Sequence, residues 1–114
     1  DPCYDYKNLS DASRKSSYKI RENQCDDKLQ EGWYRFVGAA GTKMPTTRVP
    51  ALSCGTTYSG WLIRKDSPPF TEVCFSKQNT GCKNTVSISE KECGSYHIYK
   101  LYPTKCPRRY CGSD

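Results

Sequence analysis

Eight cysteines within 114 residues constrain this chain more than any other feature of its sequence. An even, high cysteine count in a small polar chain is typical of a disulfide framework, and disulfides persist outside the cytosol because cytosolic thiols are kept reduced. We therefore expect a secreted or extracellular-surface protein that forms four disulfides. The count alone leaves roughly 100 pairings open. The cysteines are Cys3, Cys25, Cys54, Cys74, Cys82, Cys93, Cys106 and Cys111.

The size and polarity of the chain favour one domain over residues 1–114. Only 35% of the residues are hydrophobic, so apolar burial would barely offset the conformational entropy lost on folding. Each native disulfide in a small secreted domain contributes about 2–5 kcal/mol, which makes up the difference. The chain contains no apolar run of the ~20 residues that cross a bilayer, so we expect no membrane insertion. Its first residues do not resemble a signal peptide, and we expect a mature, soluble chain.

Strand-like patterns begin only after residue 31. Residues 5–24 carry few apolar side chains and predict a long loop with one helical turn. Aromatic and β-branched residues between turn signals predict strands at 32–38, 73–75, 85–89 and 96–102. Glycine and proline clusters at 38–50 and 66–70 interrupt them. The pattern predicts a small disulfide-rich, β-rich domain whose antiparallel strands are joined by long loops and stapled by four disulfides.

Little in the sequence supports an enzyme. A ribonuclease of this size and charge needs two catalytic histidines, and this chain has only His97, which we interpret as a structural or surface residue. A secreted phospholipase needs a His-Asp pair, but Ile98 follows the histidine. Glu90 and Glu92 have the spacing of one strand face, and we interpret them as solvated rather than as a glycosidase pair. We expect no catalytic residue, no metal site and no cofactor, because the zinc-site spacings are also missing.

The aromatic residues fall into two groups. Nine tyrosines and two tryptophans are many for so polar a chain, and such rings serve as core filler or as binding platforms. Those in strand-like segments, Trp33, Phe36 and Trp61, are predicted to pack in the core. Those in polar segments, Tyr4, Tyr6, Tyr18 and Tyr58, are predicted to be exposed.

Cations and tyrosines gather near the carboxyl end of this chain of net charge +6. The short segment from Cys106 to Cys111 is expected to hold this surface out from the body of the domain. Such a surface either keeps the protein soluble or binds an anionic glycan or an acidic protein loop through charge and ring contacts. The candidate ligand-binding residues are Lys100, Tyr102, Arg108, Arg109 and Tyr110, with Lys105 close by.

One modification signal stands out in the polar N-terminal segment. Asn8, Leu9 and Ser10 form an N-glycosylation acceptor sequence. We expect a glycan at Asn8 if a eukaryotic cell secretes the chain.

An ordered set of motifs runs through the chain: GWYRFVG, GTKMP, VPALSCG, GWL and CGSYHIYKLYPTKCPRRYCG. This set resembles the eight-cysteine domain of the uromodulin family, which also occurs in other extracellular glycoproteins, and the resemblance covers essentially the whole chain. Arg48 and Gly81 stand where many members carry a further pair of cysteines. The resemblance implies the pairs Cys3 with Cys93, Cys25 with Cys106, Cys54 with Cys111, and Cys74 with Cys82.

The resemblance also implies an extracellular role, since this domain type can present glycans to microbial adhesins. We predict a non-enzymatic recognition or adhesion module that is carbohydrate-binding (lectin-like) or glycan-presenting. Its expected partner is a glycan or an extracellular protein and not nucleic acid, and its oligomeric state stays open. The alternative is a secreted toxin or inhibitor that acts on a partner protein.

Overall fold

The chain folds around one curled β-sheet. The computed structural model describes residues 1–20, 22–65, 70–78 and 81–114. These residues form short 3-10 helices and strands, which confirms the predicted strand-rich, disulfide-stapled domain. The helices are η1 (Pro2–Tyr4), η2 (Ala12–Arg14) and η3 (Gly38–Ala40); the strands are β1 (Lys7–Leu9), β2 (Gly32–Phe36), β3 (Tyr58–Lys65), β4 (Phe70–Lys77), β5 (Gly81–Cys93), β6 (Tyr96–Leu101) and β7 (Arg108–Tyr110).

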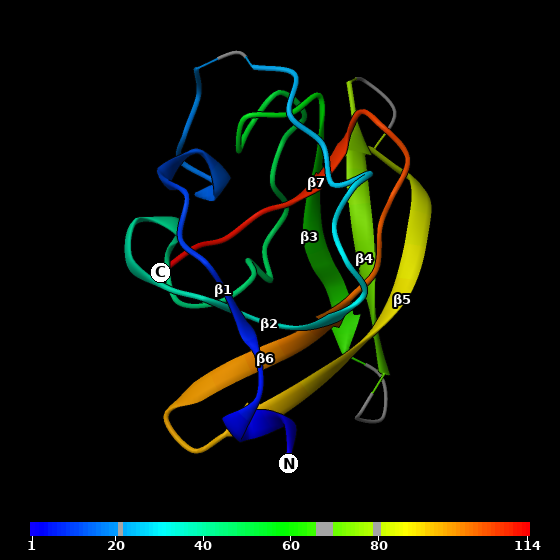
Figure 1. Ribbon diagram of the computed structural model, residues 1–114. Coiled ribbons are helices and arrows are strands. Elements are labelled where there is room, and N and C mark those ends of the chain that lie inside the picture. The colour runs from blue at the N-terminus through cyan, green and yellow to red at the C-terminus, as the bar shows by residue number, and fades with distance from the viewer. Residues whose placement is uncertain (21, 66–69, 79–80) are drawn as a thin grey trace.

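The long strand β5 joins the two halves of the sheet. The strand order is β1-β2-β6-β5-β4-β3-β7, and β5 pairs with β4 along its first part and with β6 along its last part. Figure 1 shows it crossing the molecule from β4 to β6. The central strands are antiparallel as predicted, but β1 pairs in parallel with β2 and β7 in parallel with β3. Both edge strands follow or precede long connections, which allow parallel pairing where a hairpin does not.

All four predicted strands are observed, two of them longer than predicted and two of them shorter. Strand β2 ends at Phe36, before Gly38 takes a φ of +57° at the start of η3. The segments 73–75, 85–89 and 96–102 fall within β4, β5 and β6, the last ending at Leu101. The N-terminal loop contains the predicted helical turn as η2 and also the unpredicted strand β1. The proline cluster at 66–70 was predicted to interrupt the strands. Its residues 66–69 lie outside the described part of the chain.

Every described strand contributes side chains to one apolar core. Phe36 and Tyr99 meet edge to face with ring centroids 5.9 Å apart, and the ring of Phe75 lies 5.6 Å from that of Tyr110. The core residues include Leu9, Tyr34, Phe36, Met44, Leu62, Val73, Phe75, Ile88, Tyr99, Leu101 and Tyr110. The hydroxyl of Tyr99 accepts a hydrogen bond from the backbone N–H of Met44 at 3.0 Å, which ties the loop after η3 to β6.

The aromatic predictions hold only in part. Phe36 is buried, whereas Trp33 and Trp61 are half-buried. The indole Nε1 of Trp61 donates to Ser76 Oγ at 2.7 Å, so this ring lies where its polar edge finds a partner. Tyr4 is exposed as predicted. The other three, Tyr6, Tyr18 and Tyr58, are half-buried, and Tyr58 begins β3 and packs against the core.

Four disulfides cross-link the described part of the chain. The pairs are Cys3–Cys93, Cys25–Cys106, Cys54–Cys111 and Cys74–Cys82, the same pairs that the family resemblance implies. Cys74–Cys82 joins the adjacent strands β4 and β5, while the other three connect residues at least 57 positions apart. The N-terminal segment and the loop before β2 are therefore bonded covalently to the last third of the chain.

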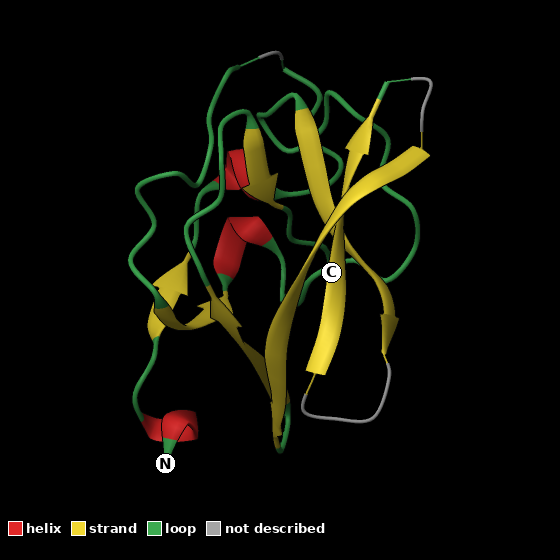
Figure 2. Cartoon of the chain, turned by 90° about the vertical axis from the view of Figure 1, so that its right-hand side faces the viewer, coloured by secondary structure: helices red, strands yellow, loops and turns green. Residues whose placement is uncertain are grey.

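The C-terminal segment crosses from one edge of the sheet to the other. In Figure 1 the red trace leaves β7 and runs toward β1, and Figure 2 shows η2 and η3 close together on one side of the sheet. Bridges join Gly112 to Lys15 and Ser113 to Lys43. A Cβ added to Gly112 would collide with the carbonyl oxygen of Ala40, so only glycine fits this crossing.

Candidate functional site

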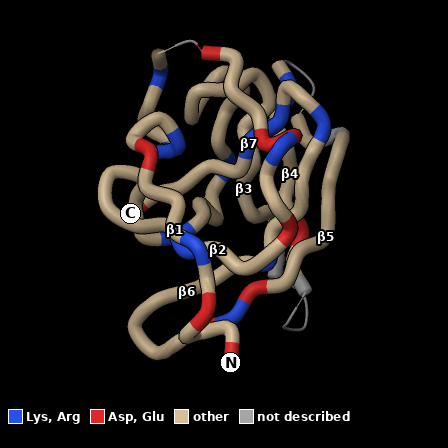
Figure 3. Tube along the Cα trace, viewed as in Figure 1, with Lys and Arg blue, Asp and Glu red and all other residues tan. Residues whose placement is uncertain are grey.

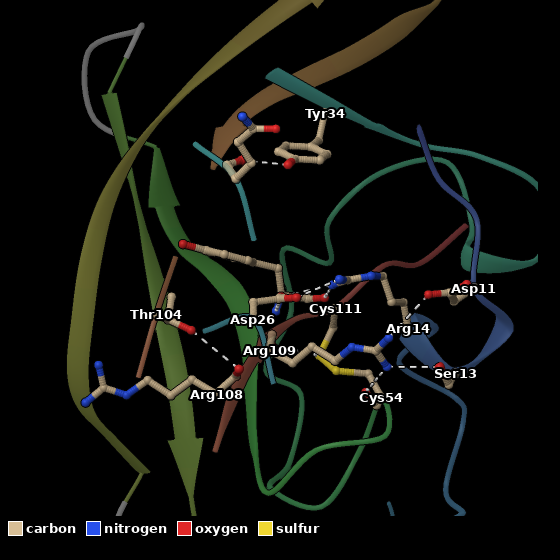
Figure 4. Close-up of polar contacts among 12 residues, drawn as sticks. Asp11, Ser13, Arg14, Asp26, Tyr34, Cys54, Thr104, Arg108, Arg109 and Cys111 are labelled. Atoms are coloured by element: carbon tan, nitrogen blue, oxygen red, sulfur yellow. Dashed lines mark hydrogen bonds and ion pairs between the residues drawn. A yellow bond between two sulfur atoms is a disulfide. The ribbon is translucent and has the colours of Figure 1, made fainter. Parts of the chain in front are cut away.

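Strand β7 separates the two arginines that the sequence analysis had placed together. Successive side chains of a strand point to opposite faces, so Arg108 and Arg109 cannot share a surface. Their side chains extend in opposite directions in Figure 4. The pairing of β7 with β3 places the two arginines at successive positions of one strand, because Arg108 pairs with Tyr58 and Arg109 with Ser59.

Arg109 is a buried structural residue, which corrects its predicted exposure. It is 3% exposed, and its Nη1 donates to Ser13 Oγ at 2.9 Å and to the carbonyl oxygen of Cys54 at 3.2 Å. Its Nη2 lies 3.5 Å from Asp11 Oδ2. Burial lowers the pKa of Arg109, with a further contribution from the neighbouring Arg14 charge. Because both terminal nitrogens contact protein atoms inside the domain, this guanidinium is not available to a ligand.

Arg14, a second buried arginine, is neutralised by the buried carboxylate of Asp26. Arg14 Nη2 and Nη1 reach the two oxygens of Asp26 at 2.6 and 3.0 Å, a bidentate geometry. Arg14 also donates to the carbonyl oxygen of Tyr110, whose N–H donates to Asp26. Figure 4 shows this network around the Cys54–Cys111 disulfide. The sequence pattern missed it because Arg14 and Asp26 lie in polar segments without a periodic signal.

Tyr110 also belongs to the interior rather than to a binding surface. Its ring is fully buried and its hydroxyl donates to the carbonyl oxygen of Tyr102 at 2.9 Å. Burial raises the pKa of Tyr110 well above its usual value. Tyr102 packs partly against the core, and Lys100 lies on β6 between Trp33 and Ser89. The five predicted ligand-binding residues therefore do not form one surface.

Arg108 instead joins a different set of residues, which we name the Lys77–Arg108 cluster: Tyr58, Lys77, Asn84 and Arg108. We assign the Asn84 amide with its oxygen toward the two cations, the orientation in which it can accept from both; Lys77 Nζ then lies 3.0 Å and Arg108 Nη2 3.3 Å from that oxygen. Lys77 Nζ lies 5.3 Å from the ring centroid of Tyr58. Figure 3 shows Lys and Arg positions near β7, with Asp or Glu positions beside them. No carboxylate of the described residues forms an ion pair with either cation.

A cation–aromatic stack lies at the other edge of the sheet. The guanidinium carbon of Arg35 lies 3.9 Å from the ring centroid of Tyr96, and Arg35 Nη1 donates to the hydroxyl of Tyr6 at 3.0 Å. Asn8 pairs with Arg35 across strands β1 and β2 and is exposed. The predicted glycan acceptor is therefore accessible beside this stack.

The remaining candidates for catalysis or metal binding are a histidine–glutamate pair and one group of potential metal ligands. His97 Nδ1 lies 3.4 Å from Glu90 Oε2, and the Glu90 side chain is only 10% exposed. This corrects the expectation that Glu90 shares a solvated face with Glu92, which is exposed. Among the described residues, one group of potential metal ligands gathers within 4.8 Å, namely Cys25, Asp27 and Cys106. Both sulfurs are consumed in a disulfide, so the group offers a single carboxylate.

The comparison with known proteins identifies the same family as the ordered cysteine motifs. A profile of the uromodulin-like eight-cysteine domain matches residues 34–112. The chain belongs to this family. It is 36% identical to the pancreatic secretory granule membrane major glycoprotein GP2 of Rattus norvegicus over 121 residues, and 34% identical to uromodulin of Mus musculus over 119 residues. Each comparison covers 97% of this chain, but 23% of the GP2 sequence and 18% of uromodulin.

These relatives confirm the predicted family and location. The uromodulin-like domain described here is an extracellular glycoprotein-type module, secreted or displayed at the cell surface, in keeping with its four disulfides. None of the helices in the described ranges is long and apolar enough to cross a membrane. The chain spans about a fifth of the length of the relatives it matches.

Proposed function

We propose that this uromodulin-like domain is a non-enzymatic recognition or adhesion module that binds an anionic group of a glycan or extracellular protein at the Lys77–Arg108 cluster. The observation that carries the proposal is the convergence of two cations, Lys77 and Arg108, on the neutral amide group of Asn84. A buried or half-buried cation is ordinarily balanced by a carboxylate, as Arg14 is by Asp26.

The cluster has the geometry of an anion-binding surface. Lys77 and Arg108 approach the same oxygen, so a carboxylate or sulfate can replace it and accept from both cations in charge-assisted hydrogen bonds. The Tyr58 ring lies against Lys77 and provides an apolar surface beside the charge. Of the five residues predicted to bind a ligand, Arg108 alone contributes to this surface.

A glycan array and a binding titration at low and physiological salt test the proposal. The wild type should bind acidic glycans or acidic proteins more weakly as salt rises, because exposed charges are screened over about 8 Å at physiological strength. The double variant Lys77→Gln/Arg108→Gln should lose most of this binding. Lys7→Gln, which removes one exposed cation on β1 at the opposite edge of the sheet, should retain it. Salt-insensitive binding to a protein, unchanged in the double variant, would favour the inhibitor alternative.

A specific observation also supports glycan presentation. Asn8 is exposed on the edge strand β1, so an attached glycan would project from the sheet without displacing core residues. Secretion from eukaryotic cells followed by glycosidase treatment should lower the mass of the wild type. Ser10→Ala removes the acceptor sequence while keeping Asn8, and it should show no mass change. A wild-type chain secreted without a glycan would contradict this role.

A further inference from the structure

A separate groove lies away from the Lys77–Arg108 cluster. It is lined by residues 16, 17 and 19, by residues 43 and 45–50 of the loop after η3, and by residues 113 and 114. Its volume of about 480 Å³ falls within the roughly 300–1,000 Å³ of ligand pockets. Nothing in the proposed function uses this groove.

The walls of the groove are fixed by backbone hydrogen bonds. Ser16 N–H donates to the carbonyl oxygen of Gly112, and Ser113 N–H donates to that of Lys43, each at 2.7 Å. The carbonyl oxygen of Pro45 accepts from Leu62 of β3 at 2.8 Å. Val49 is buried against the Cys54–Cys111 disulfide. The groove is therefore preformed, which lowers the ordering cost of binding.

The groove carries an excess of positive charge. Lys19, Lys43 and Arg48 line it, and all three are exposed. Lys19 Nζ is held in place by Ser53 Oγ at 2.8 Å and by the carbonyl oxygen of Ser16 at 3.2 Å. The lining carboxylate of Asp114 is paired with Lys15 outside the groove at 2.7 Å. No described carboxylate forms an ion pair with Lys43 or Arg48.

The other lining groups determine which anion fits. Ser17, Thr46 and Thr47 present hydroxyls, which donate and accept hydrogen bonds as sugar hydroxyls require. Pro50, which is exposed, supplies apolar surface for the C–H face of a ring. The described lining residues include no aromatic side chain on which a neutral sugar could stack. We propose that this groove binds an acidic saccharide, whose carboxylate or sulfate contacts Arg48 and Lys43 while its hydroxyls contact Ser17, Thr46 and Thr47.

Nuclear magnetic resonance titration of the isotope-labelled full chain tests the proposal directly. The probes are sialyllactose for a carboxylate, a sulfated disaccharide for a sulfate, and lactose as the neutral control. We expect saturable shifts at residues 16–19 and 43–50 with at least one acidic probe and none with lactose. Arg48→Gln and Lys43→Gln should each weaken binding about tenfold, the loss of one charge-assisted hydrogen bond.

Two control variants distinguish binding in this groove from binding at the Lys77–Arg108 cluster. Lys77→Gln/Arg108→Gln should leave the groove shifts intact, so failure of the proposed function would not remove them. Lys28→Gln matches the charge change at a position outside the groove and should bind as the wild type does. Equal shifts with lactose, or unchanged affinity in both groove variants, would overturn the proposal. Preferential binding of an acidic peptide would also overturn it and assign the groove to a protein ligand.

Discussion

Arg14 and Asp26 form a bidentate ion pair inside the domain, with Nη2 and Oδ1 2.6 Å apart and both side chains almost fully buried. The pair joins η2 to the loop before β2, and Asp26 also holds the N–H of Tyr110 in β7. Three segments that are distant in sequence therefore share one carboxylate.

Removing that carboxylate should leave a buried cation without compensation. We expect Asp26→Asn to lower the free energy of unfolding by about 3–5 kcal/mol. Asp11→Asn is the matched control, because the Asp11 side chain is 69% exposed where it contacts Arg109. Exposed pairs contribute about 0–1 kcal/mol, so this control should unfold almost as the wild type does. Urea denaturation of both variants measures the difference, and equal losses would contradict the assigned roles.

The two adjacent arginines of β7 should behave oppositely. Arg109→Ala leaves the buried carbonyl of Cys54 without one of its donors and should destabilise the fold by about 2 kcal/mol or more. Arg108→Ala removes a half-buried side chain that makes surface contacts and should change stability by about 0.5 kcal/mol while weakening anion binding. Thermal unfolding combined with a binding titration separates these effects. A stable Arg109 variant that has lost binding would contradict its structural role.

Burial of tyrosine hydroxyls predicts a loss of stability at alkaline pH. Desolvation raises the pKa of Tyr99 and of Tyr110 in the folded state. The folded protein therefore binds these protons more tightly than the unfolded chain, so their contribution is complete below about pH 10, the ordinary tyrosine pKa, and declines above it. Denaturation midpoints between pH 8 and 11 should fall only at the upper end. The control Tyr110→Phe should flatten this fall, and an unchanged profile would contradict the explanation.

Gly112 should tolerate no side chain. In Gly112→Ala the new Cβ would collide with the Ala40 carbonyl oxygen and lie 2.7 Å from the Phe36 ring, which forces the C-terminal crossing to move. We expect a loss of roughly 1–3 kcal/mol, typical of overpacking. Gly32→Ala is the control because nothing lies within 4 Å of its added Cβ, and alanine there should be neutral or slightly stabilising. Equal stability of the two variants would contradict the close packing.

The sequence predicted the features of the fold that depend on patterns among neighbouring residues. The β-branched residues at 85–89 correctly indicated a strand, and the ordered cysteine motifs led to the family. The short edge strands β1 and β7 escaped prediction, because three residues carry too little periodicity and their pairing depends on the rest of the sheet.

The candidate site was harder to predict than the fold. Reading Arg108, Arg109 and Tyr110 as a strand would have separated the two arginines, since neighbours in a strand face opposite ways. The partners of Arg108 could not be found in the same manner. Lys77 and Asn84 reach it only through the pairing of β4 with β5 and of β7 with β3.

The pairing of the cysteines determines when this domain can mature during its synthesis. Ribosomes deliver the N-terminal residues first, so Cys3, Cys25 and Cys54 enter the secretory compartment well before their partners Cys93, Cys106 and Cys111. Cys74–Cys82, eight positions apart, can close as soon as this segment has entered the compartment, whereas the other three bonds must wait for residues 93, 106 and 111. Cys3, Cys25 and Cys54 are therefore free thiols in an oxidising lumen before their partners arrive. We expect this domain to need disulfide isomerases, which break prematurely formed bonds.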